Sequence, residues 1–213
     1  MNQKVFCIGF HKTGTSSIAK ALEILGFKVC RRIKMVESKM TYGSVLESLI
    51  ENNLQNIYPA VEHFEAFVDN PWALIFKEID QQFPNSKFIL TIRDEESWIK
   101  SVLNYFQGYE TNIRKLIYGV ASPFGNEVIY LNRYRFHNEE VLKYFKSRSN
   151  DLLIIDLKRD NNWDNLCQFL DLPTPLIEFP HENKTNQNDS ANLESRIKRK
   201  LNIKRVKNFL KTE

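Results

Sequence analysis

The sequence has few of the residues that mark several protein classes. Its three cysteines are scattered at positions 7, 30 and 167, which argues against a disulfide framework and favours a reducing compartment. No apolar run approaches the ~20 residues that a membrane-spanning helix needs. Glycine and proline number seven each, and there is no internal repeat or low-complexity segment. With 42% hydrophobic residues in 213, one sizeable globular core is expected.

A strong overall charge is also missing, since the formal net charge is +4. Residues 190–213 carry eight Lys/Arg against two Glu, so the rest of the chain is nearly neutral. We therefore expect a domain over 1–189 that does not bind nucleic acid, followed by a basic helix or tail over 190–213 that packs on the same domain. The alternative is that this tail contacts an acidic partner or an anionic membrane surface. The N-terminus shows no signal segment, so a cytoplasmic location is expected.

The most informative stretch lies near the N-terminus. Val5–Ile8 is a short apolar run that predicts a buried strand, and apolar residues at helical spacing begin after Thr15 and end before Gly26. Between them lies HKTGTSS, a tight turn with one lysine, one glycine and four hydroxyls. A helix N-terminus presents unpaired N–H groups and the positive end of its dipole, so this turn is a candidate anion site.

The turn differs from the loop that binds nucleoside triphosphates, G-x-x-x-x-G-K-[ST]. Gly9 and Gly14 have the required separation, but Thr15 stands where that loop has lysine. The lysine is Lys12, two residues before the second glycine. This displacement moves the ammonium from the helix start to the shoulder of the loop and argues against an ordinary ATPase or kinase.

The remaining chain alternates strand and helix patterns, which predicts a parallel sheet covered by helices. Further strands are expected over 66–69, 87–92 and 152–156, and further helices over 44–54, 72–83, 95–106, 127–148 and 163–170. Residues 107–126 are expected to form a mobile loop on the substrate side, with a short helix. The expected fold is α/β: a single P-loop domain of three layers, with a central parallel sheet flanked by helices.

A second candidate anion site follows the strand expected over 87–92. Arg93 ends that strand, and Ser101 lies eight residues later on the next helix. Positions seven apart on a helix return to nearly the same face, so Ser101 projects in about the direction of Asp94 and the strand end. A guanidinium and a hydroxyl placed in this way can converge on one phosphate.

The two motifs, in this order, resemble those of the P-loop sulfotransferases. These enzymes take a sulfuryl group from 3′-phosphoadenosine 5′-phosphosulfate (PAPS) and release 3′-phosphoadenosine 5′-phosphate (PAP). HKTGTSS is similar to their 5′-phosphosulfate loop, and Arg93 with Ser101 to their 3′-phosphate motif. FVDNPWALIFKEID and LLIIDLKRDNNWDNLCQFL also look like parts of the compact single-domain members, so the resemblance covers most of residues 4–185. The segments 28–65 and 107–135, where acceptor specificity would be built, show none.

The resemblance implies a role for each motif residue. Lys12 would stabilise charge on the leaving oxygen, and Gly14 would let the backbone approach the donor closely. PAPS would also be bound by other residues of the two motifs, namely His11, Thr13, Thr15, Ser16, Ser17, Arg93 and Ser101. No metal is required, and the four histidines are far apart in the sequence.

The base that takes the acceptor's proton is open. The cytosolic members have a histidine at the end of the second strand, before a turn with proline, and here Asp69 precedes Asn70-Pro71. Carbohydrate-type members use a carboxylate for the same step, which makes Asp69 the first candidate. The alternatives are that Asp69 caps the following helix and that His63 is the base.

Two features of the cytosolic members are missing. Ile18 stands near the position of the tryptophan that stacks on adenine, and the late R-K-G-x-x-G phosphate clamp is absent. Lys184, Arg133 and Arg135 are candidates to replace the clamp, although each also fits an ordinary surface position. Trp98 and Trp163 are expected in the core.

The sequence thus predicts a PAPS-dependent sulfotransferase that acts on a hydroxyl or an amine of a small molecule, lipid or saccharide. One alternative is a P-loop nucleotide or small-molecule kinase with an atypical loop. Another is a protein that binds PAP or PAPS without catalysis.

Overall fold

The computed structural model describes residues 3–31, 47–159 and 162–182. The chain divides into two units, Met1–Glu182 and Asn183–Glu213. The second unit, which contains Lys184 and the basic tail, lies outside the described residues. The expectations about the tail and about Lys184 therefore stay predictions.

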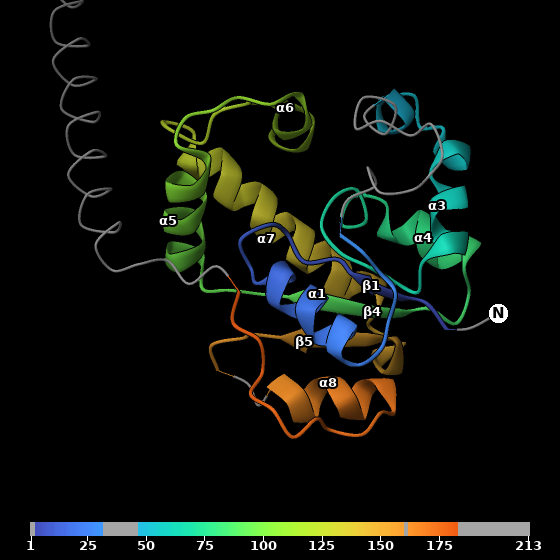
Figure 1. Cartoon of the computed structure of the whole chain (residues 1–213). Helices are drawn as coiled ribbons and strands as arrows, with labels where there is room; N and C mark the ends of the chain where they lie inside the picture. Colours follow the sequence, from blue (N-terminus) through green and yellow to red (C-terminus); the bar gives the residue numbers. More distant parts are fainter. Residues whose placement is uncertain (1–2, 32–46, 160–161, 183–213) are drawn as a thin grey trace, which may run out of the picture. The chain divides into compact units, whose positions relative to one another are not determined.

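The centre of the first unit is a parallel sheet of five short strands (Figure 1). The strands are β1 (Val5–Cys7), β2 (Val29–Cys30), β3 (Ala66–Phe67), β4 (Lys87–Thr91) and β5 (Leu152–Ile155). Their order is β2-β3-β1-β4-β5, and every pair of neighbours is parallel. The loops that follow β1, β3 and β4 consequently leave the sheet at the same edge, which is where open α/β sheets bind ligands.

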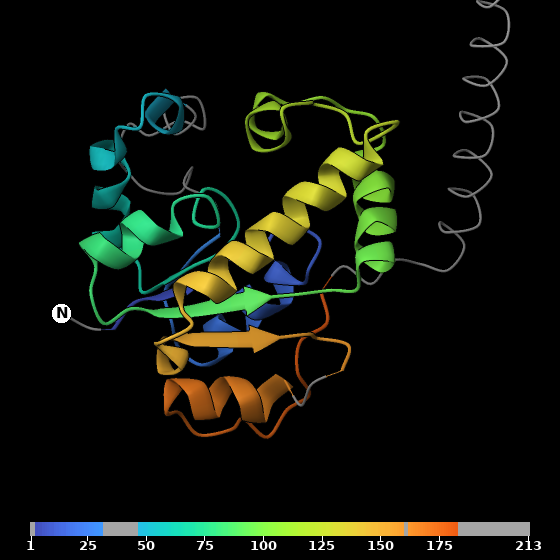
Figure 2. The same ribbon diagram turned by 180° about the vertical axis from the view of Figure 1, so that it is seen from behind.

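Helices connect the strands and cover the sheet. They are α1 (Thr15–Ile24), α3 (Tyr58–His63), α4 (Phe76–Gln82), α5 (Glu95–Phe106), α6 (Asn112–Tyr118), α7 (Glu127–Tyr144) and α8 (Asn162–Leu170), with short 3₁₀ turns η2 (Leu54–Asn56) and η3 (Ser149–Asp151). In the view from behind, α7 crosses in front of the sheet and β4 runs toward α5 (Figure 2). The predicted α/β architecture with a helix-covered parallel sheet is confirmed.

Alternating side chains of β1 divide the core into two layers, as the two-residue period of a strand requires. Phe6 and Ile8 pack on one face of the sheet, against residues of α3, α4 and α7. Val5 and Cys7 pack on the other face, against residues of α1 and α8. Both faces are therefore buried, and the site has to lie at the edge of the sheet.

Several elements differ from expectation at their bounds. The helix expected over 72–83 begins at Phe76, because the preceding residues form a turn in which Leu74 N donates to Pro71 O at 2.7 Å. β2 and α3 were not expected. The helix expected over 44–54 lies partly outside the described residues, and residues 47–50 of it are helical.

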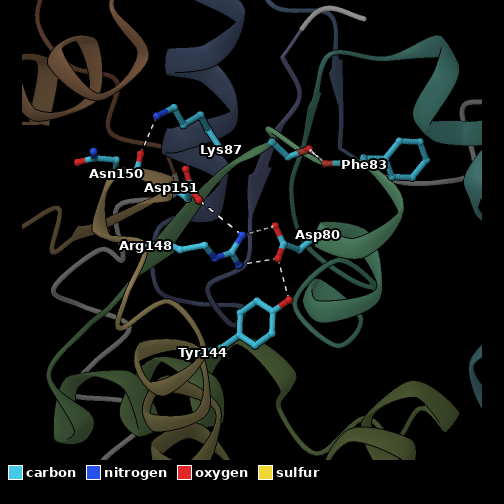
Figure 3. A network of polar contacts seen from close by, with 8 residues as sticks. Asp80, Phe83, Lys87, Tyr144, Arg148, Asn150 and Asp151 are labelled. Carbon is cyan, nitrogen blue, oxygen red and sulfur yellow. Dashed lines mark hydrogen bonds and ion pairs between the residues drawn. The ribbon is translucent and has the colours of Figure 1, made fainter.

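The helix expected over 127–148 ends at Tyr144. Tyr144 and the residues that follow it take part in a polar network (Figure 3). Arg148 donates to both carboxylate oxygens of Asp80 on α4, at 3.1 and 2.6 Å, and Tyr144 Oη donates to the same carboxylate at 2.7 Å. Lys87 Nζ donates to Asn150 O at 2.6 Å. The network joins α4 to the end of α7. Because Lys87 begins β4, it lies at the edge of the sheet opposite the turn between β1 and α1.

Candidate active site at the carboxyl edge of the sheet

The turn between β1 and α1 is built around two glycines. A Cβ on Gly9 would lie 2.0 Å from Thr91 Oγ1, so only glycine lets this strand end approach β4. Gly14 has φ +107° and is the N-cap of α1, and a Cβ there would lie 2.3 Å from Leu157 Cδ1. No side chain of the described residues caps α1 at Gly14, and Ser17 N donates to Gly14 O at 2.9 Å. The N–H groups that precede Ser17 in this ten-residue helix are the ones suited to a ligand.

Buried hydroxyls fix the shape of the turn. Thr13 Oγ1 donates to Phe10 O at 2.5 Å and is hydrogen bonded to Thr91 Oγ1 at 2.5 Å. Both threonine side chains are buried. Thr13 therefore ties the loop to the end of β4, and its hydroxyl is hydrogen bonded within the protein.

The hydroxyls at the start of α1 reach two other segments. Thr15 Oγ1 donates to Asp69 Oδ1 at 2.6 Å, directly after β3. Ser17 Oγ accepts a hydrogen bond from Glu182 N at 3.0 Å. Ser16, at the first turn of α1, is partly exposed. The loop after β1 is thus bound to the segments after β3 and β4.

The second motif meets the first directly. Arg93 donates from Nη1 to Lys12 O at 3.1 Å, and Arg93 Nε is buried with no hydrogen-bond partner among the described residues. On α5, Trp98 Nε1 donates to His11 O at 2.9 Å. Ser101 lies one helical turn later, between Trp98 and Tyr105, which both contact the loop, and its side chain is buried. The predicted proximity of the two motifs is present in the structure.

Lys12 lies at the centre of this arrangement. Its φ is +67°, and its Nζ lies 4.0 Å from the centroid of the Tyr105 ring. Burial and the neighbouring Arg93 guanidinium lower the pKa of Lys12, and the negative charge of Asp69 opposes that shift. Two cations and one carboxylate therefore share a partly buried space, a combination suited to holding an anion and moving a proton.

Asp69 follows β3 in a left-handed conformation, with φ +66°. It does not cap the following helix, because α4 begins only at Phe76 and its N-cap is Ile75. Its carboxylate accepts from Thr15 at the start of α1 and acts electrostatically on Lys12. This geometry argues against the cap, and the role of Asp69 as a base stays a prediction.

The structure does not bring every predicted site residue to the loop. His63 is exposed at the end of α3, three residues before β3, at the opposite edge of the sheet from Lys12. Arg135 is exposed and ion-paired with Glu95, which makes it an ordinary surface cation. Arg133 is half-buried with its Cζ 5.3 Å from the ring centroid of Phe10.

The His11 side chain belongs to an aromatic cluster rather than to the anion loop. Its Nε2 is hydrogen bonded to Tyr118 Oη at 2.9 Å, and its ring packs edge-on to Phe106 with the centroids 5.0 Å apart. Burial, with the charges of Arg114 and Lys12, lowers the pKa of His11 to about 3. The imidazole is thus neutral near pH 7 and hydrogen bonded within the protein. The predicted contact of His11 with PAPS stays a prediction.

Sequence reasoning missed two contributors to the site. Thr91 is the last residue of β4 and was treated only as part of a strand. Tyr105 was treated as part of the helix expected over 95–106, but it is 60% exposed and its ring lies against the Lys12 ammonium. Its position four residues after Ser101 was the available signal, since residues four apart share a helix face. Trp98 and Trp163 are buried, as expected.

Comparison with known proteins agrees with this geometry. The sulfotransferase domain family model matches residues 4–129 and 120–188. The chain is also similar to the Ava biosynthesis cluster protein M of Aspergillus versicolor, with 23% identity over 216 residues that cover 84% of this chain and 80% of that protein. The protein belongs to the sulfotransferase domain family.

The described residues contain neither a candidate membrane span nor a candidate metal centre. None of their helices is both long and apolar enough to cross a membrane. Within the same ranges, no three His, Cys, Asp or Glu side chains gather as a metal ion would need. The expectation of metal-free transfer stays a prediction.

Proposed function

We propose that this protein transfers a sulfuryl group from PAPS to a hydroxyl or an amine of a small molecule, lipid or saccharide. The observation that carries the proposal is the hydrogen bond from Arg93 Nη1 to Lys12 O, which joins the two candidate anion motifs. PAPS has a phosphosulfate at its 5′ end and a phosphate at its 3′ position. A pair of neighbouring anion sites matches such a donor better than a single triphosphate loop would.

The residues present fit the donor in two ways. Gly14 has no Cβ and an uncapped helix begins beside it, so the backbone N–H groups of α1 suit the 5′ group. Arg93 Nε is buried and has no partner in the described part of the chain, which suits a phosphate oxygen at the 3′ position. Ser101 would add a hydroxyl to the same phosphate.

Lys12 and Asp69 would have different roles in the transfer. PAPS supplies a sulfuryl group, which passes to the acceptor oxygen or nitrogen as its bond to the 5′-phosphate oxygen breaks. Lys12 would stabilise the negative charge that develops on the phosphate side, as preorganised cations do in the related phosphoryl transfers. Asp69 would take the acceptor's proton, and its hydrogen bond from Thr15 would fix the orientation of the carboxylate.

Thermal unfolding with added nucleotides tests the proposal. PAP at 100 times its dissociation constant should stabilise the protein by about 2.7 kcal/mol. Stabilisation by ATP with Mg²⁺ but not by PAP would refute the proposal and favour a kinase. Stabilisation by PAP without transfer to any acceptor would instead favour a binding protein.

The proposal includes a cytoplasmic location and a role for the basic residues 190–213 in contacting an acidic partner or membrane surface. Eight Lys/Arg in this stretch supply the attraction. Vesicles that contain anionic lipid should bind the full chain at low ionic strength and release it as salt is added. Salt-independent binding, or none, would contradict this role.

A further inference from the structure

Arg114 is a buried donor group without an acceptor among the described residues. It lies on α6 and keeps 3% of its surface exposed. Its Nε and Nη2 atoms are buried and have no hydrogen-bond partner in the described part of the chain. The guanidinium face packs on Phe106, with Cζ 4.0 Å from the ring centroid. That contact stabilises the face of the cation but leaves its N–H groups unpaired.

Arg133, on α7, has the same property. Its Nη1 is buried and has no partner among the described residues, and burial lowers the pKa of the side chain. The acid whose charge acts most on Arg133 is Glu140, which is ion-paired with Lys77. Both guanidinium groups pack on rings that contact one cluster. Arg133 Cζ lies 5.3 Å from the centroid of Phe10, whose ring packs edge-on to Tyr118 with the centroids 6.2 Å apart. Phe106, the ring under Arg114, packs edge-on to His11, which is hydrogen bonded to Tyr118.

Aromatic rings surround these cations and lead to Lys12. Tyr118 stacks on Tyr130, with the centroids 3.7 Å apart, and is hydrogen bonded to His11. The Arg114 guanidinium packs on the ring of Phe106. The preceding residue, Tyr105, covers the Lys12 ammonium. The cluster therefore adjoins the proposed position of sulfuryl transfer, on the side formed by α6 and α7.

We infer that Arg114 and Arg133 form a subsite for a carboxylate on the acceptor. The inference rests on the proposed function. An arginine fork matches a carboxylate through two parallel hydrogen bonds, which would satisfy the buried N–H groups. The proposed donor contacts lie over 12–17 at the start of α1, at Arg93 between β4 and α5, and on α5, whereas these arginines lie on α6 and α7. The surrounding rings favour a flat apolar skeleton, so the acceptor class is an aromatic hydroxy acid.

A matched pair of probes tests the subsite. Para-hydroxyphenylacetate carries a carboxylate, and para-hydroxyphenylethanol replaces it with a neutral alcohol of similar size. Each is titrated calorimetrically into the full chain that has first been saturated with PAP. We expect the acid to bind at least tenfold more tightly than the alcohol. Equal affinities, or no measurable binding of the acid, would overturn the inference.

Variants assign the preference to the two arginines. Arg114→Met and Arg133→Gln should each remove most of the preference for the acid, while PAP affinity stays unchanged. Arg135→Gln, an exposed position on α7 paired with Glu95, is the control and should keep the preference. A preference that survives in both variants, or a loss of PAP affinity that assigns the arginines to the donor, would overturn the inference. Failure of PAP to bind the wild-type protein would instead reject the proposed function.

Thermal stability gives a readout that does not depend on the probes. A buried charge with unpaired N–H groups destabilises the fold, and an apolar residue of similar length often improves it. Arg114→Met should therefore raise the melting temperature of the ligand-free protein. A lower melting temperature together with retained acid binding would assign Arg114 a structural role. If Arg114→Met does not fold, Arg133→Gln decides the acid preference.

Discussion

Arg93 donates a hydrogen bond through Nη1 to the main-chain oxygen of Lys12, at 3.1 Å. Lys12 has a positive φ, which is unfavourable for a residue with a Cβ, so the bond helps to hold a strained turn. Trp98 holds the preceding residue through His11 O. The end of β4 and the start of α5 therefore determine the shape of the loop, and the loop position of Lys12 depends on residues more than 80 positions away.

Replacing Lys12 should lower the turnover number much more than it lowers the affinity for PAP. Lys12→Ala removes the cation proposed to stabilise the leaving phosphate, and we expect kcat to fall about 10²–10³-fold, the effect of losing one transition-state donor. PAP affinity should fall much less, because the backbone and Arg93 remain. Lys20→Ala is the control, since Lys20 lies on the exposed side of α1. Undiminished release of PAP from PAPS in the Lys12 variant would contradict the assigned role.

The role of Asp69 can be separated from its structural contact. Asp69→Asn keeps an oxygen that accepts from Thr15 Oγ1 but cannot take a proton. We expect kcat to fall about 10²–10⁴-fold while the melting temperature and PAP affinity stay close to wild type. Single-turnover assays measure the loss. Retained activity would move the base elsewhere, and His63→Gln, at the other edge of the sheet, should have no effect.

Tyr105 is predicted to position the Lys12 ammonium. Its ring lies 4.0 Å from Lys12 Nζ and is largely exposed, so it contributes little to the core. Tyr105→Ala should lower kcat/KM by roughly three- to tenfold, the size of a partly desolvated cation–π contact. Tyr105→Phe keeps the ring and should restore most of the activity. A Phe variant as impaired as the Ala variant would show that the hydroxyl matters instead.

Two histidines should make the fold sensitive to acid. Burial is the main cause that lowers the pKa of His11 to about 3 and of His137 to about 4, from the usual 6.5. Between those values the unfolded chain binds more protons than the folded one, so stability falls as pH drops below about 6.5. Each histidine contributes a slope that approaches about 1.4 kcal/mol per pH unit.

Urea denaturation at several pH values between 7 and 5 measures this slope. His137→Gln should reduce it, because glutamine can still donate to Ile8 O, the partner of His137 Nε2 at 2.7 Å, without titrating. A stability that is constant over this range would contradict the account of the buried histidines.

Local patterns predicted most of the fold and the two motifs. The strand, loop and helix around Lys12 follow from a short apolar run, a glycine and a helical repeat. The helix expected over 95–106 is α5, and Asp94 caps it by accepting from Ser97 N. β2 was missed because a strand of two residues has no measurable period. α3 was missed for a similar reason, because six residues are too few to show a clear helical period of apolar residues.

Long-range contacts could not be predicted from the sequence. The bonds of Thr13 to Thr91 and of Thr15 to Asp69 join residues that only the sheet order brings together. The buried state of Arg114 likewise depends on how α6 packs, and arginine is usually a surface residue. Sequence patterns thus located the two candidate anion motifs, whereas the proposed acceptor subsite required the structure.

Comparing the affinities of PAP and AMP, which differ only in the 3′-phosphate, tests the central claim most directly. Wild-type protein should bind PAP about 10–100-fold more tightly, the value of one or two charge-assisted hydrogen bonds. In Arg93→Met this ratio should fall close to one, while Arg135→Met should keep it. Equal affinities of the wild-type protein for PAP and AMP, or a ratio that survives in Arg93→Met, would contradict the account.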